Sequence, residues 1–158
     1  MNIPRAAAAG TIATGVLTAL WLIEPSIGLP KIAVGQILST VMSVSVGNLN
    51  VGAAGGWAVH LLVGIGFALI YAAFLYDRLP GHTLTRGAMY GAMIFLLAQI
   101  AFMPLVGGGF FSSGDVELLL GSLIGHVAYG VVLGWIYGLP LDASAAATPR
   151  SPLTTGAT

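Results

Sequence analysis

Charged residues are scarce in this chain, and cysteine is missing. Of the 158 residues, five are Lys or Arg and five are Asp or Glu, whereas 57% are hydrophobic. Soluble domains carry about 25% charged residues, because charge is what they present to water. So few charges cannot cover a soluble domain of this length, and we expect lipid to contact most of the surface. The zero net charge also argues against nucleic acid as a partner.

The absence of cysteine excludes disulfides, thiolate metal sites and iron–sulfur clusters. A Cys-His arrangement is excluded for the same reason. A Ser-His-Asp arrangement cannot be assembled either, because no spare acid lies within the apolar segments. The sequence therefore predicts no catalytic site of the soluble type, and it allows a redox role only through a bound cofactor.

Four apolar segments are long enough to cross a hydrocarbon core about 30 Å thick, which needs roughly 20 helical residues. They lie at about residues 6–23, 54–76, 84–106 and 116–139. A lone strand cannot satisfy its backbone in lipid, so we predict an all-α membrane protein with one four-helix domain over residues 1–140.

Two further segments are not expected to cross. Residues 31–46 have apolar side chains at helical spacing, but the run is short and broken by serines. We therefore predict an interfacial or re-entrant helix there. Residues 141–158 are mostly Ala, Ser, Thr and Pro, and we expect a disordered tail because they cannot bury enough apolar surface.

The basic residues predict the orientation. Four of the five fall on one side of the four spans: Arg5, Arg78, Arg86 and Arg150. The positive-inside rule then places both termini in the cytoplasm. Aromatic residues near the span ends are typical of interfacial belts, and these are Trp21, Trp57, Tyr76 and Tyr90.

An internal repeat relates the second and fourth spans. Residues 55–64 read GGWAVHLLVG and residues 121–130 read GSLIGHVAYG, so His60 aligns with His126 and Gly64 with Gly130. A weaker echo relates the first and third spans. We predict two repeated hairpins related by an axis along the membrane normal. The two histidines should then lie at one depth, on helices of the same direction.

The paired histidines suggest axial ligands of haem b. A haem needs two neutral imidazoles facing each other across the porphyrin, which two equivalent helices can supply. Gly64 and Gly130 lie one turn after His60 and His126, where a missing side chain leaves room for a macrocycle. A cofactor-free alternative is a structural role, in which each histidine bonds a carbonyl or hydroxyl across a helix interface.

A metal site is a second alternative for His60 and His126. It needs a third ligand, and Glu24 is the acidic residue near a span end at comparable depth. A Glu before a Pro at a helix end is more typical of a solvated terminator. Gln99 is the one amide within a predicted span, and we expect it to bond to a neighbouring helix.

Several motifs resemble those of a known family. They are residues 55–71, the MPLVGGG run at 103–109, and residues 119–130 followed by GWIYG at 134–138. Over about residues 5–139 the chain resembles a family of small bacterial four-helix membrane proteins catalogued only as a domain of unknown function. The resemblance implies four spans and the bacterial inner membrane, and it carries no known activity.

Three functions are compatible with these features. The first is an accessory or structural subunit of a larger membrane complex, such as a respiratory one, with lipid and other membrane subunits or further copies of itself as partners. The second is a haem b electron-transfer protein that uses His60 and His126. The third is a small transporter or channel, a class that usually shows more intramembrane charge.

Overall fold

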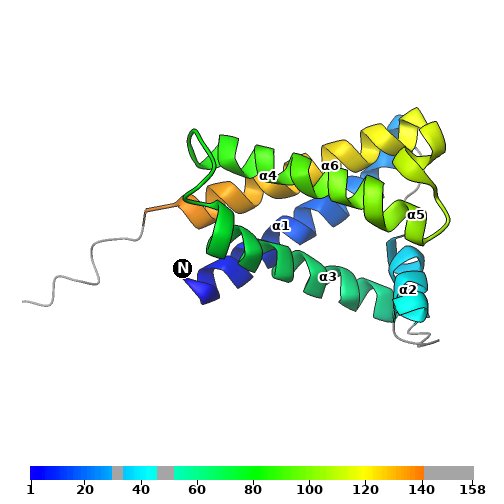
Figure 1. Ribbon diagram of the computed structural model, residues 1–158, viewed down its shortest axis with the longest axis horizontal. Helices are drawn as coiled ribbons and strands as arrows, with labels where there is room; N and C mark the ends of the chain where they lie inside the picture. The colour runs from blue at the N-terminus through cyan, green and yellow to red at the C-terminus, as the bar shows by residue number, and fades with distance from the viewer. Residues whose placement is uncertain (30–33, 46–51, 141–158) are drawn as a thin grey trace, which may run out of the picture.

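The computed structural model of the protein describes residues 1–29, 34–45 and 52–140, and over these ranges it contains helices and no strand. Four long helical segments form a bundle (Figure 1) and confirm the predicted fold class. The first segment is α1 Ile3–Ile23, continued by the 3-10 turn η1 Glu24–Ile27, and the second is α3 Gly52–Ile70, continued by the π-helix η2 Tyr71–Leu75. The third is α4 Thr83–Leu97, continued by the π-helix η3 Ala98–Phe102 and the short α5 Met103–Leu105. The fourth is α6 Val116–Gly138. Each is long and apolar enough to cross a membrane.

The segment between α1 and α3 contains one short helix, α2 Val34–Ser45. Its 12 residues span about 18 Å, which is too short for a hydrocarbon core of about 30 Å. Helix α2 packs against α3 at one end of the bundle (Figure 1). The structure confirms a helix within residues 31–46, and its interfacial or re-entrant placement stays a prediction. The predicted disordered tail lies outside the described residues.

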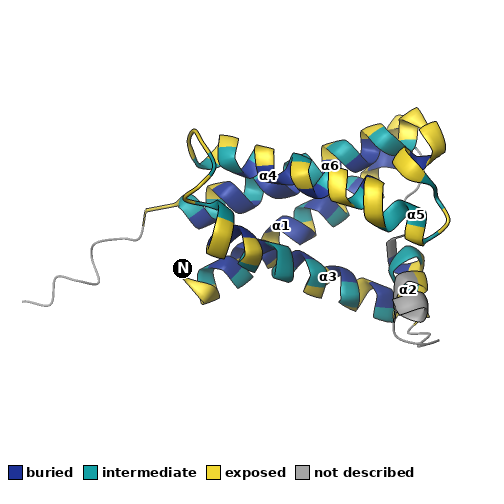
Figure 2. Cartoon of the chain, viewed as in Figure 1, coloured by how far each residue is buried: buried dark blue, intermediate teal, exposed yellow. Residues whose placement is uncertain are grey.

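Glycines bring α4 and α6 into backbone contact. A Cβ atom on Gly130 would lie 2.1 Å from the Gly87 carbonyl oxygen, and one on Gly91 would lie 2.3 Å from the His126 carbonyl oxygen. Apolar side chains gain little by leaving lipid, so membrane helices associate through such close packing. The buried surfaces of the four helices face one another (Figure 2), and large apolar side chains such as Leu62 and Phe74 are exposed on the outside.

One end of the bundle is closed by aromatic rings, and we call it the tyrosine end. The ring of Tyr71 lies 5.0 Å from that of Tyr90, and the ring of Tyr76 lies 4.9 Å from that of Tyr137. The Tyr90 hydroxyl donates to the Phe67 carbonyl at 2.7 Å, which ties α4 to α3. The tyrosine end is therefore held by hydrogen bonds as well as by ring packing.

Two arginines close the same end in equivalent ways. Arg5, at the start of α1, donates from Nε to the Ile136 carbonyl at 3.1 Å, near the end of α6. Arg86, at the start of α4, donates to the Tyr76 carbonyl at 3.0 Å, just after η2. Both carbonyl groups lie at the C-terminal end of a helical segment, where side chains commonly supply donors. Because each arginine belongs to one hairpin and binds the other, their equivalence supports the predicted repeat.

The two hairpins nevertheless pack asymmetrically. Helix α1 packs along α6, but the equivalent pair, α3 and α4, has no comparable contact among the described residues. In Figure 1, α3 and α4 diverge away from the tyrosine end toward α2 and α5. We call this opposite end the α2 end.

Candidate functional site

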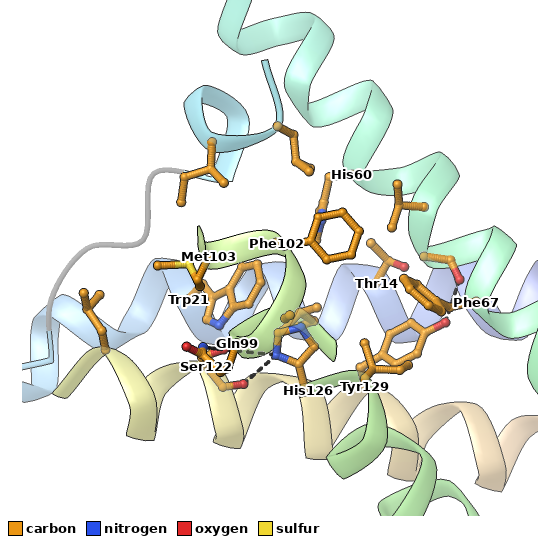
Figure 3. Close-up of a pocket in the computed structure, with 18 of the residues that line it drawn as sticks. Thr14, Trp21, His60, Phe67, Gln99, Phe102, Met103, Ser122, His126 and Tyr129 are labelled. Atoms are coloured by element: carbon orange, nitrogen blue, oxygen red, sulfur yellow. Dashed lines mark hydrogen bonds between the residues drawn. The ribbon is translucent and has the colours of Figure 1, made fainter. Parts of the chain in front are cut away.

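Both predicted histidines line one cavity, which lies where α3 and α4 diverge. His60 reaches it from α3 and His126 from α6 (Figure 3), and the cavity volume is about 370 Å³. We call it the histidine cavity. Its walls are largely apolar, with nitrogen- or hydroxyl-bearing side chains at eight positions: Thr14, Trp21, His60, Gln99, Ser112, Ser122, His126 and Tyr129. The repeat predicted a shared depth for the two histidines, and the structure brings them to one site.

A backbone contact fixes the proton position on His126. Its Nδ1 atom lies 2.7 Å from the Ser122 carbonyl oxygen, one turn earlier on α6. A carbonyl can only accept, so Nδ1 carries the hydrogen and Nε2 carries the lone pair. This arrangement leaves Nε2 as the ligating atom, and metal-binding histidines are commonly oriented in the same way.

His60 has a buried nitrogen with no partner. Its side chain is 8% exposed, and Nε2 makes no hydrogen bond among the described residues. A buried polar atom without a partner costs free energy and calls for an explanation. His60 lines the cavity, but its Nε2 atom is covered by protein atoms, so a ligand could reach that atom only after the side chain turns.

Trp21 contacts both histidines. The centre of its ring lies 5.6 Å from that of His60 and 5.8 Å from that of His126. The prediction that Trp21 belongs to an interfacial aromatic belt is therefore wrong, because its side chain is 8% exposed and lines the cavity. The position of Trp21 along α1 was compatible with both an interfacial belt and a cavity wall. Only the packing of the helices shows that it belongs to the cavity wall.

A hydrogen bond beside the cavity joins the two helices that carry the histidines, α3 and α6. The Tyr129 hydroxyl on α6 donates to the Gly64 carbonyl on α3 at 2.6 Å. Gly64 itself lies against α1, since a Cβ there would be 1.9 Å from the Thr14 hydroxyl oxygen. Gly130 packs on α4 rather than lining the cavity, so its missing side chain serves helix packing.

A chain of hydrogen bonds connects His126 with the loop before α6. Ser112 donates to the Gln99 amide oxygen at 2.9 Å, and the Gln99 amide nitrogen donates to the Ser122 hydroxyl at 3.1 Å. The Ser122 hydroxyl in turn lies 3.3 Å from His126 Nδ1. The expectation that Gln99 bonds to a neighbouring helix agrees with this contact to α6, and the two serines were not anticipated.

Local backbone geometry places Gln99 and Ser112, two members of this hydrogen-bond chain. Gln99 lies in η3, and Pro104, which has no N–H, leaves a carbonyl in that turn without its usual donor. Such π-helical turns are frequent at functional sites. Ser112 lies in η4, Phe110–Gly114, where Phe111, Ser112 and Ser113 all adopt left-handed φ values of 47°, 51° and 54°. The hydrogen bond to Gln99 holds this strained turn over the cavity.

We expect Gln99→Leu to detach the turn from the cavity. The substitution removes the amide partner of both serines and leaves the buried Ser112 hydroxyl unpaired, which costs about 1–3 kcal/mol. Hydrogen exchange followed by mass spectrometry should show faster exchange at residues 110–114, while exchange at the tyrosine end stays unchanged. Ser113→Ala is the matched control, because the Ser113 hydroxyl bonds to Gly108 outside the chain. Equal exchange in Gln99→Leu and wild type would contradict this role.

Glu24 does not join the two histidines. Among the described residues, no three His, Asp or Glu side chains are close enough to hold a metal ion. The proposed three-ligand metal site of His60, His126 and Glu24 is therefore not formed. Glu24 is also not a solvated terminator, because it is 4% exposed and its carboxylate lies against Gly121 on α6.

The fold is a helical bundle with four helices long and apolar enough to cross a membrane. The chain belongs to a family of unknown function, DUF6789, whose model matches residues 1–147. This agrees with the resemblance to an uncharacterised family seen in the sequence motifs. No curated protein and no solved structure matches the chain.

Proposed function

We propose that the protein binds haem b in the histidine cavity, with His60 and His126 as axial ligands, and carries electrons within the membrane. The observation that carries this proposal is the meeting of both histidines at one apolar cavity, with the proton of His126 placed on Nδ1. Two neutral imidazoles are the ligand set of many membrane cytochromes.

The surroundings fit such a group. The cavity volume of about 370 Å³ lies within the range of roughly 300–1,000 Å³ for small-molecule sites. Its apolar walls keep the imidazoles neutral, and neutrality is what iron ligation requires.

The proposed setting follows from the charge distribution and the family resemblance. We propose that the protein lies in the bacterial inner membrane with both termini in the cytoplasm. The tyrosine end then faces the cytoplasm, because Arg5, Arg78 and Arg86 lie at that end. The histidine cavity then belongs to the outer half of the membrane.

An absorbance spectrum tests the function directly. The purified chain in mild detergent, titrated with ferric haem b, should develop a Soret band and, after reduction with dithionite, the sharp visible bands of a six-coordinate haem. A folded protein that leaves the spectrum of free haem unchanged would contradict the proposal.

An accessory role in a larger membrane complex is the second candidate. The short connection between Leu75 and Thr83, and large exposed apolar residues on every span, favour docking against other membrane subunits. Co-purification of further membrane proteins from native membranes in mild detergent supports this role, and a monomer without partners opposes it.

A further inference from the structure

The turn η4 forms a thin part of the wall of the histidine cavity. Ser112 lines the cavity and is 6% exposed, whereas the residues on either side of it, Phe111 and Ser113, are exposed. A single turn of backbone therefore separates the cavity from the outside at this point. The turn belongs to the connection between the third and fourth spans, Thr83–Leu105 and Val116–Gly138, so we expect its exposed side to face water at the membrane surface.

A hydrogen bond ties this turn to the helical segment behind it. The Ser112 hydroxyl donates to the Gln99 amide oxygen at 2.9 Å. The Ser113 hydroxyl instead donates to the Gly108 carbonyl at 3.0 Å, within the same connection. Ser112 therefore fastens the turn to the cavity wall, while Ser113 holds the connection to itself.

The closed turn is strained, and its two ends can rotate. Phe111, Ser112 and Ser113 adopt left-handed φ values, which cost free energy for residues with a side chain. Gly107 and Gly114 lie on either side of the turn at φ values of 83° and 84°. A Cβ on either glycine would meet no atom of the described residues within 4 Å, so packing does not fix these two positions. The strained residues can therefore relax once the hydrogen bond to the cavity wall is broken.

Gln99 connects the turn with one of the histidines. Its amide nitrogen donates to the Ser122 hydroxyl at 3.1 Å, and the Ser122 carbonyl oxygen lies 2.7 Å from His126 Nδ1 (Figure 3). Release of Ser112 leaves the Gln99 amide oxygen without its donor, so the amide becomes free to turn away from Ser122. Opening of the turn is thereby coupled to the contacts that orient His126.

We propose that η4 is a gate through which water and small polar molecules enter the histidine cavity, and that the hydrogen bond between Ser112 and Gln99 keeps it closed. When this bond breaks, η4 moves outward about Gly107 and Gly114 and exposes the cavity at the α2 end. The inference rests on the cavity of the proposed function but uses no property of haem.

Quenching of Trp21 fluorescence by acrylamide tests the gate. Trp21 lines the cavity, and it is one of three tryptophans, so Trp57→Phe together with Trp135→Phe leaves it as the sole tryptophan. In this background, in detergent and without haem, Ser112→Ala should raise the quenching constant. Loss of one hydrogen bond shifts the ratio of open to closed turns about fivefold. Gln99→Leu removes the same bond and should also raise the quenching constant.

Two further variants show whether the effect belongs to the gate. Ser113→Ala is the matched control and should leave quenching unchanged, because its hydroxyl bonds within the connection. Phe111→Asn should lower quenching, because asparagine adopts left-handed φ values more readily than phenylalanine and so stabilises the closed turn.

Equal quenching in Ser112→Ala and the background overturns the gate, and so does an equal rise in Ser113→Ala. If Ser112→Ala lacks the helical circular dichroism of the background, Phe111→Asn decides instead, and unchanged or stronger quenching in that variant overturns the gate. Haem takes no part in these measurements. Failure of the gate is therefore distinct from failure of haem binding, which its own titration reports.

Discussion

His126→Ala is expected to abolish the six-coordinate haem spectrum that wild-type protein forms with haem b. The variant removes the ligand whose Nε2 lone pair is set by the 2.7 Å contact between Nδ1 and the Ser122 carbonyl. His60→Ala should have the same effect, because a six-coordinate haem needs both imidazoles. Titration of each variant with ferric haem b, followed by absorbance, measures the loss.

The third histidine provides a matched control. His82 is exposed, immediately precedes α4 and lies outside the cavity. His82→Ala should bind haem b as the wild type does. The six-coordinate spectrum of the wild type in both His60→Ala and His126→Ala would show that these side chains are not the ligands. Each folded variant should keep the helical circular dichroism of the wild type, so loss of the band can be separated from loss of structure.

Gly130→Val is expected to destabilise the protein by about 3 kcal/mol, the upper end of the usual cost of overpacking. The reason is direct backbone contact, since a Cβ on Gly130 would lie 2.1 Å from the Gly87 carbonyl oxygen and 2.8 Å from Gly91 Cα. Flexible side chains can turn aside from an added methyl group, but the backbones of two packed helices cannot. Thermal unfolding in detergent, monitored by circular dichroism, should show a clear fall in midpoint.

Gly66→Val is the control for this prediction. Gly66 lies within α3, and a Cβ there meets no atom within 4 Å. Its replacement should leave the unfolding midpoint nearly unchanged or raise it, because glycine is a poor helix former. Equal midpoints for Gly130→Val and Gly66→Val would show that α4 and α6 do not pack as closely as described.

The arrangement of spans was predictable because it depends on run length and composition, which the sequence states directly. The site was predictable in part. The shared frame around His60 and His126 identified both histidines, since duplication places equivalent residues at equivalent depth. Ser122 carries a usable signal too, because it lies one turn before His126 on the same helix face.

Other parts of the site depend on packing that no local pattern encodes. Trp21 and Glu24 looked like residues of a membrane interface, but glycines on α6 let α1 approach and bury both. Ser112 reaches Gln99 only because three consecutive residues adopt left-handed φ values, which non-glycine residues rarely do. The unequal packing of the two hairpins is a further example. The repeated sequences suggest that α3 packs along α4 as α6 packs along α1, but among the described residues only α1 and α6 do so.

The difference between the two ends of the bundle determines how the cavity can exchange its contents. Tyr90 and Tyr129 donate hydrogen bonds to carbonyl groups of α3, and the ring cluster packs beside them at the tyrosine end. These contacts hold α3 against α4 and α6, so we expect the helices to move relative to one another mainly at the α2 end. The α2 end, where α3 and α4 separate, is therefore the end at which we expect molecules to enter and leave the cavity.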